Sequence, residues 1–140
     1  MTNREIYELY GCLIRNQQIK YSKTAYAAYK TLASIKDQGE IVEKFRLSLI
    51  KEYGKETENG NYTLNANDIP EEAVRKLEDL FDEETKVKIF KVSKETFDSD
   101  VEKLITENGV SVGDCSILER WLVDEPVQSS DDKDAAEEKS

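Results

Sequence analysis

The sequence predicts an α+β fold that is predominantly helical, with a long helical hairpin, a small two-stranded β element and short C-terminal helices. Apolar residues recur at the spacing of amphipathic helices through most of residues 1–124. Residues 85–92 instead alternate in character and are rich in β-branched side chains, which is typical of a strand. Asn59-Gly60 is a strong signal for a tight turn between short extended segments. Helices should therefore dominate, with one small β element among them.

Two helices are expected at the start of the chain, folded on each other as the hairpin. Thr2 and Glu5 have the spacing of a capping box, which starts the first helix there and lets it run to about residue 17. The second helical pattern covers 24–53 and contains Gly39. We favour one continuous helix, because a single internal glycine costs only about 1 kcal/mol. Two helices kinked at 37–39 are the alternative.

The long helix carries a regular apolar stripe. Ile35, Val42 and Leu49 are seven residues apart, as in the seam of a short coiled coil. Such a seam buries its side chains against a second helix. These three residues are therefore a candidate seam for binding a partner protein or for joining copies of this chain.

The middle of the chain should contain the β element and one more helix. A small hairpin or a loop is expected over 58–64. A helix over about 70–84 follows, with Leu77 and Phe81 on its buried face. A strand at 85–92 needs a partner, for which the turn segment is the candidate within this chain.

Two short helices are predicted near the C-terminal end of the apolar pattern. Ser99 with Glu102 opens the first as a capping box, and Ser111 with Asp114 opens the second. Trp121 lies in the second helix and is expected to be the largest anchor of the C-terminal core.

The domain organisation follows from where the apolar periodicity stops. We predict a single helical α+β domain over 1–124 and a disordered acidic tail over 125–140. The 140 residues carry a net charge of −10, and the stretch from Asp124 to Ser140 contributes −5 of it. The predicted tail is thus the most acidic part of the chain.

Composition excludes several classes of protein. The chain has no histidine, which removes the commonest general base and metal ligand. Cys12 and Cys115 lie among apolar residues and are expected to be small core residues in a reducing compartment. No apolar run is long enough for a spanning helix or a signal peptide, so we expect a cytoplasmic protein without a membrane partner. We also expect no enzymatic activity, no metal and no cofactor.

A basic segment is the candidate anion-binding site. Residues 9–36 contain five cations and no acid, with tyrosines between them. Cations with aromatic rings can bind a phosphate backbone and stack bases. The alternative is an ordinary solvated face on a protein whose net negative charge repels polyanions. The candidate residues are Arg15, Lys20, Tyr21, Lys23, Tyr26 and Lys30.

Acidic residues form two further clusters. Glu71, Glu78 and Asp82 fall on one side of the helix expected over 70–84. Carboxylates held together in a pocket can bind magnesium, but we favour a solvated surface here. The acidic tail could shield the basic segment, although most such tails only keep a protein solvated.

A series of short motifs runs through residues 5–124: Ile6-Tyr7-Glu8-Leu9-Tyr10, Lys23-Thr24-Ala25-Tyr26-Ala27, Glu52-Tyr53-Gly54, Lys76-Leu77-Glu78-Asp79-Leu80, Glu84-Thr85-Lys86-Val87-Lys88-Ile89, Val110-Ser111-Val112 and Ser116-Ile117-Leu118-Glu119-Arg120-Trp121-Leu122. Their order resembles that of small uncharacterised proteins of tailed phages and prophages of Gram-positive bacteria. The resemblance implies a phage-encoded accessory or structural protein and brings no catalytic residues. This chain departs from the pattern by a shorter middle and by its acidic tail.

Three classes of function remain as hypotheses. The first is a non-enzymatic phage protein that acts through protein–protein contacts, in virion assembly or against a host factor. Its partner would be a phage protein, a host protein or further copies of itself, in the host cytoplasm or in the virion. The alternative is a nucleic-acid-associated protein that uses the basic segment 9–36. A carboxylate-based metal enzyme is the third class.

Overall fold

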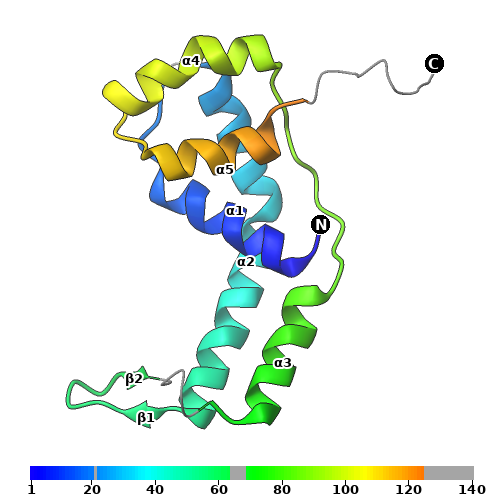
Figure 1. The fold of residues 1–140 in the computed structure, drawn as a ribbon, viewed down its shortest axis with the longest axis vertical. Helices are drawn as coiled ribbons and strands as arrows, with labels where there is room; N and C mark the ends of the chain where they lie inside the picture. The colour runs from blue at the N-terminus through cyan, green and yellow to red at the C-terminus, as the bar shows by residue number, and fades with distance from the viewer. Residues whose placement is uncertain (21, 64–68, 125–140) are drawn as a thin grey trace. The chain divides into compact units, whose positions relative to one another are not determined.

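The computed structural model spans residues 1–140 and describes 1–20, 22–63 and 69–124. The described helices and strands are, in chain order, α1 (Asn3–Arg15), α2 (Lys23–Tyr53), β1 (Lys55–Glu56), β2 (Tyr62–Thr63), α3 (Glu71–Asp82), α4 (Lys94–Thr106) and α5 (Val112–Leu122). The fold is therefore predominantly helical α+β, as the sequence predicts (Figure 1). The predicted tail at 125–140 lies outside the described residues.

The chain divides into two compact units. Unit 1 consists of Met1–Arg15 and Thr31–Lys88, and unit 2 consists of Asn16–Lys30 and the described residues of 89–124. The helix α2 thus begins in unit 2 and ends in unit 1. A single domain over 1–124 stays a prediction.

The two N-terminal helices form where the sequence predicts them. Thr2 and Glu5 make the reciprocal bonds of a capping box, with N–O distances of 2.9 and 3.2 Å. α2 is one continuous helix of 31 residues, so the prediction of one helix rather than two is confirmed. Ser22 caps it, and its Oγ accepts a hydrogen bond of 3.0 Å from the Ala25 amide.

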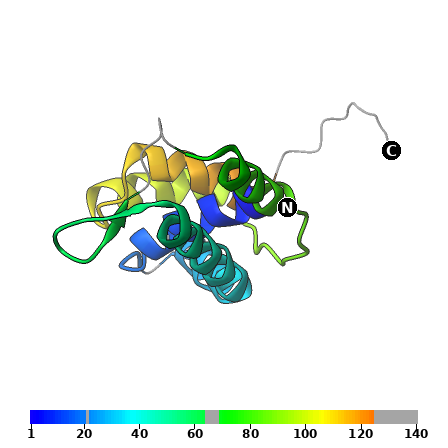
Figure 2. The same ribbon diagram turned by 90° about the horizontal axis from the view of Figure 1, so that it is seen from below.

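In unit 1, the two helices of the expected hairpin, α1 and α2, are joined by a third helix, α3. α1 crosses α2, and α3 runs beside the C-terminal half of α2, as Figures 1 and 2 show from two directions. At the crossing the Tyr10 ring lies directly against Gly39, where an added Cβ would be 2.4 Å from the Tyr10 Cγ. The glycine therefore allows two helices to approach closely and does not kink α2.

Asn3 joins three parts of unit 1. Its side chain is fully buried, and its Nδ2 donates to the Leu80 carbonyl at 2.9 Å. Its Oδ1 accepts from Gln38 Nε2 at 3.0 Å and from Thr85 Oγ1 at 2.9 Å. Because a buried polar atom without a partner costs about 1–3 kcal/mol, this network fixes the start of α1 against α2 and the end of α3.

The β element forms around the predicted turn. β1 and β2 pair antiparallel, with Lys55 opposite Thr63 and Glu56 opposite Tyr62. Gly60 in the turn has a φ of 79°, a conformation that glycine adopts without steric cost. Of the two outcomes expected over 58–64, a small hairpin and a loop, the structure contains the hairpin.

The prediction of a strand at 85–92 is wrong. Across the described residues, this stretch contributes one isolated bridge, between Val92 and Val123, and no ladder. Its backbone is held in other ways, for example by the Lys88 amide, which donates to Ser34 Oγ at 3.1 Å. Val87 is half-buried while its neighbours are exposed, so the alternation marks an extended connection with one side turned inward.

In unit 2, α4 begins earlier than predicted. Its N-cap is Ser93, whose Oγ accepts from the Thr96 amide at 3.1 Å, so the predicted cap Ser99 lies inside the helix. The glutamate three residues after Ser99 imitates a capping box in sequence alone. α5 begins as predicted, with Ser111 accepting from the Asp114 amide at 3.0 Å.

Leucines form the core of unit 2. Leu118 and Leu122 have no exposed surface, and Leu104 is 1% exposed. Trp121 is only half-buried, so the prediction that it is the largest core anchor is wrong. Cys115 is buried and free, and so is Cys12 in unit 1, which confirms both as core residues.

Candidate functional site

An apolar groove lies between α2 and α3 in unit 1. The C-terminal half of α2 and α3 run next to each other in Figure 1, and the groove lined by both has a volume of about 430 Å³. Its apolar lining comes from Leu49 and Ile50 of α2 and from Ala73, Val74, Leu77 and Phe81 of α3. We call this feature the α2–α3 groove.

The apolar face of α3 is only partly buried. Of the residues of α3, all of them described, Ala73 alone is fully buried. Val74 is 38% exposed, and Leu77 and Phe81 are half-buried. The sequence predicted the apolar face correctly, but the prediction that it is buried is wrong. Contiguous apolar surface of this kind marks interaction sites in folded proteins.

The facing wall of the groove belongs to α2. Leu49 forms its floor and is 5% exposed, and Ile50 beside it is half-buried. The exposed apolar surface of the groove therefore lies mainly on the α3 wall, at Val74, with partly exposed side chains on both walls.

One end of the groove is built from aromatic and arginine side chains. The Phe81 ring centroid lies 5.8 Å from that of Tyr7. The guanidinium carbon of Arg4 lies 5.1 Å from the Phe81 centroid, and Arg4 also pairs with Asp82 at 3.5 Å. These contacts fix the position of the Phe81 ring at the end of the groove.

A charged network adjoins this end. The Glu43 carboxylate accepts from the Tyr7 hydroxyl and from Nε and Nη2 of Arg46, the latter two at 3.0 and 3.1 Å. The bonds from Arg46 lower the pKa of Glu43, although partial burial opposes them. Burial, followed by the bond to Glu43, raises the pKa of Tyr7. At neutral pH the ionised Glu43 therefore balances the charge of Arg46.

The outer flank of α3 carries more negative than positive charge, because Arg75 there is outnumbered by acidic residues. Glu71 and Glu78 are seven residues apart on one side of the helix, and both are exposed. Glu78 also lines the groove. Within the described chain neither of these glutamates forms an ion pair, whereas Asp82 on the same side pairs with Arg4. One edge of the groove is therefore acidic.

The predicted seam residues do not face a partner. Ile35 and Val42 have no exposed surface and Leu49 has 5%, so all three are buried within this chain. A side chain without exposed surface cannot contact a second chain in this conformation. The heptad spacing therefore reflects the chain's own core, and of the three residues Leu49 alone also lines the α2–α3 groove.

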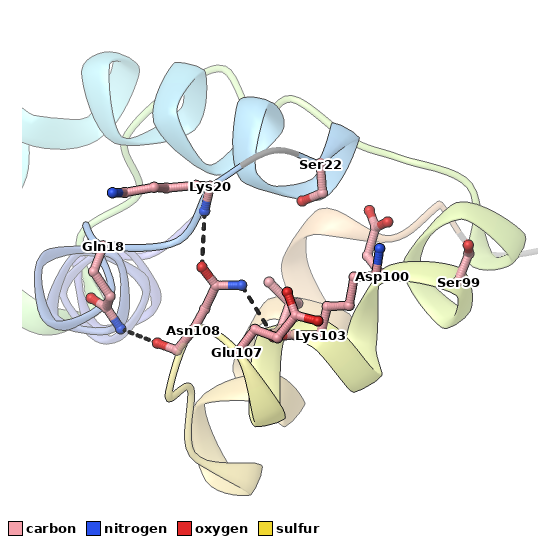
Figure 3. A pocket seen from close by; sticks show the side chains of 9 residues that line it. Gln18, Lys20, Ser22, Ser99, Asp100, Lys103, Glu107 and Asn108 are labelled. Carbon is pink, nitrogen blue, oxygen red and sulfur yellow. Dashed lines mark hydrogen bonds between the residues drawn. The ribbon is translucent and has the colours of Figure 1, made fainter.

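Unit 2 contains a polar cavity of about 470 Å³ (Figure 3). Lys20 of the predicted anion-binding segment lines it together with Lys103. Asp100 and Glu107 line it as well, so two carboxylates balance the two lysines. The cavity consequently offers no excess of positive charge to an anion.

Asn108 connects the walls of this cavity. Its Oδ1 accepts from the Lys20 amide at 3.1 Å, and its carbonyl accepts from Gln18 Nε2 at 2.8 Å. Its Nδ2 donates to the Lys103 carbonyl at 3.1 Å, as Figure 3 shows. These polar groups therefore hold the segment before α2 against the end of α4.

Asp100 occupies the N-terminus of α2. Its Oδ2 accepts from the Thr24 amide at 3.1 Å and from the Thr24 hydroxyl at 2.7 Å. The positive end of a helix attracts anions, and here the chain supplies the negative charge itself. The Thr24 amide at this end of α2 therefore already has a hydrogen-bond partner, and the carboxylate of Asp100 already stabilises the positive end of the helix.

The predicted anion-binding residues are divided between the units. Arg15 belongs to unit 1, and the described candidates Lys20, Lys23, Tyr26 and Lys30 belong to unit 2. The Lys30 ammonium lies 4.8 Å from the Tyr26 ring centroid and 4.5 Å from that of Phe90. Tyr21 lies outside the described residues. The structure thus brings Tyr26 and Lys30 together and places Lys20 in the polar cavity.

The described residues contain neither a cluster of metal ligands nor a helix that could span a membrane. No three histidine, cysteine, aspartate or glutamate side chains of that part lie close enough to hold a metal ion. None of its helices combines the length and apolar character needed to span a bilayer. Glu71, Glu78 and Asp82 lie on a solvated surface.

Sequence reasoning missed the groove because it treated each apolar face as core. The signal present in the sequence is the strong apolar stripe on α3. Spacing alone cannot tell whether the rest of the chain covers such a stripe.

Comparison with protein-family models, with curated proteins and with solved structures finds no match.

Proposed function

We propose that this chain is a non-enzymatic protein that acts by binding another protein through the α2–α3 groove. We further propose that it is an accessory or structural protein of a phage, which functions in virion assembly or by binding a host factor. The phage assignment rests on the order of the sequence motifs described above.

The partly exposed apolar face of the groove is the observation that supports protein binding. Val74 on the α3 wall is 38% exposed, and Ile50, Leu77 and Phe81 in the lining are partly exposed. Covering an apolar side chain of this size removes surface from water and stabilises a complex by about 25 cal/mol per Å². A partner that fills the groove would therefore gain affinity from side chains that contribute little to folding of the free chain.

The nucleic-acid alternative has less support. Asp100 occupies the N-terminus of α2, and Lys30 is engaged by two aromatic rings. The net charge of −10 opposes the approach of a polyanion. We therefore propose protein rather than nucleic acid as the partner.

Protein binding is tested by capture from host-cell lysate with three baits: the natural chain and its Val74→Glu and Val112→Glu variants. Both valines are exposed, at 38% and 70%, but only Val74 lies in the groove. We expect a specific protein, identified by mass spectrometry, to be lost with V74E and retained with V112E. The same pattern should return with the purified pair. Equal capture by both variants would contradict a role for the groove.

The phage assignment is tested by mass spectrometry of purified particles. A virion component should be present at a constant copy number per particle. If the protein is absent from particles but accumulates in infected cells, it acts on a factor inside the host. Absence from both would overturn the assignment.

A further inference from the structure

We infer that the α2–α3 groove binds one amphipathic helix of another protein, and that this helix carries basic residues on the flank that faces α3. The inference rests on the proposed function and adds the chemistry of the partner. Three arguments lead to it: the shape of the groove, the charge on its α3 flank, and the repulsion between the acidic flanks of two copies that met there.

The shape favours a helix. Ala73 and Phe81 mark the two ends of the apolar wall on α3, and their spacing corresponds to about 12 Å of helix. That length equals about two turns, over which a partner helix presents apolar residues at positions i, i+4 and i+7. Helices also pack readily into the space between two neighbouring helices. An extended peptide would instead need a sheet edge, and β1 and β2 have only two residues each.

The charge favours a basic flank. The arginines at the groove are already engaged, Arg46 by Glu43 and Arg4 by Asp82. Glu71 and Glu78 on the α3 flank have no such ion-pair partner in the described chain. Arg75 lies between them on the same flank and also forms no ion pair in the described chain, so the two glutamates exceed it by one negative charge. Lysine or arginine on the partner helix would balance that excess.

The same charge disfavours a second copy as the occupant. Two copies that met through this groove would bring acidic α3 flanks near one another, on chains that each carry a net charge of −10. Like charges at an interface oppose association. A different protein with a basic helix avoids this repulsion.

The test uses two synthetic helical peptides of ~15 residues with the same leucine stripe. One carries lysine on the flank beside the stripe and the other carries glutamate there. Binding to the full chain is measured by fluorescence anisotropy at several salt concentrations. We expect the lysine peptide to bind about tenfold more tightly, with a preference that shrinks as salt rises.

Two pairs of variants separate groove binding from general attraction to an acidic protein. V74E makes the chain more acidic, so general attraction predicts tighter binding of the lysine peptide, whereas groove binding predicts at least about tenfold weaker binding. V112E is the matched control and should leave the affinity within about twofold. The double variant Glu71→Lys/Glu78→Lys should reverse the peptide preference, while Glu102→Lys/Glu107→Lys in unit 2 changes the net charge equally and should retain it.

The outcomes distinguish this inference from the proposed function. If both peptides bind equally and V74E weakens both, the groove binds helices without the proposed charge preference, and only the inference fails. Tighter binding of the glutamate peptide would also overturn it. If sedimentation shows a dimer of the free chain that V74E dissociates, the occupant is a second copy. Failure of the lysate experiment, by contrast, would overturn the proposed function itself.

Discussion

The helices α3 and α5 are almost equal in length, with 12 and 11 residues, but they bury their apolar faces to very different extents. α5 buries Cys115, Leu118 and Leu122, whereas α3 fully buries Ala73 alone. The more strongly amphipathic of the two is the one whose apolar face is less completely buried. An apolar stripe therefore predicts which side of a helix avoids water, but it does not show whether the same chain or a partner covers that side.

Truncation of a core leucine should give the largest effect and test this comparison directly. Leu118→Ala removes a side chain with no exposed surface, so the free energy of unfolding should fall by about 3 kcal/mol. Leu77→Ala on α3 should cost only about 1 kcal/mol, because that side chain is half-buried. Urea denaturation followed by circular dichroism measures both. Equal losses would mean that the α3 face contributes to folding as much as the α5 face does.

Gly39→Ala should give the next largest effect on the free energy of unfolding. In an exposed helix interior this change normally stabilises by about 1 kcal/mol. Here the new Cβ would lie 2.4 Å from Tyr10 Cγ, so the ring or the helix must move. We expect a net loss of about 2 kcal/mol in thermal or urea unfolding. Stabilisation would contradict the close crossing of α1 and α2, and Tyr10→Ala in the same background should restore part of the loss.

The network beside the groove predicts a pH-dependent effect of about 1 kcal/mol. The folded state lowers the pKa of Glu43, so its contribution is present above the pKa of the unfolded chain and disappears as pH falls through the folded pKa. Both partners are about one third exposed, which limits the magnitude. Glu43→Gln should therefore be less stable than the natural chain at neutral pH, and the difference should shrink as pH falls through the folded-state pKa of Glu43. A pH-independent difference would assign the effect to packing.

The smallest expected effect on stability is that of Val74→Glu. The valine is 38% exposed and contributes little to the core, so unfolding should change by no more than about 0.5 kcal/mol. Loss of partner binding without loss of stability would sharpen the contrast between α3 and α5. A loss comparable to that of Leu118→Ala would show that the face is needed for folding.

The errors in the sequence prediction have specific physical causes. Residues 85–92 have the composition of a strand but make no ladder, because β pairing needs a neighbour that propensity does not supply. The spacing of Ile35, Val42 and Leu49 is the same for a core as for a seam between chains. The start of α4 was misplaced because Ser99 and Glu102 imitate a capping box in a helix that already begins after Ser93.

The helical character, the continuity of α2, the capping box at Thr2 and the cap at Ser111 could be predicted from the sequence alone, since these depend on interactions between near neighbours. Contacts between residues far apart decided the rest. The packing of Tyr10 on Gly39, the burial of the α2 stripe and the partly exposed face of α3 depend on which elements meet in space. Local patterns specify what each segment can form, and only tertiary packing selects the surfaces that remain for a partner.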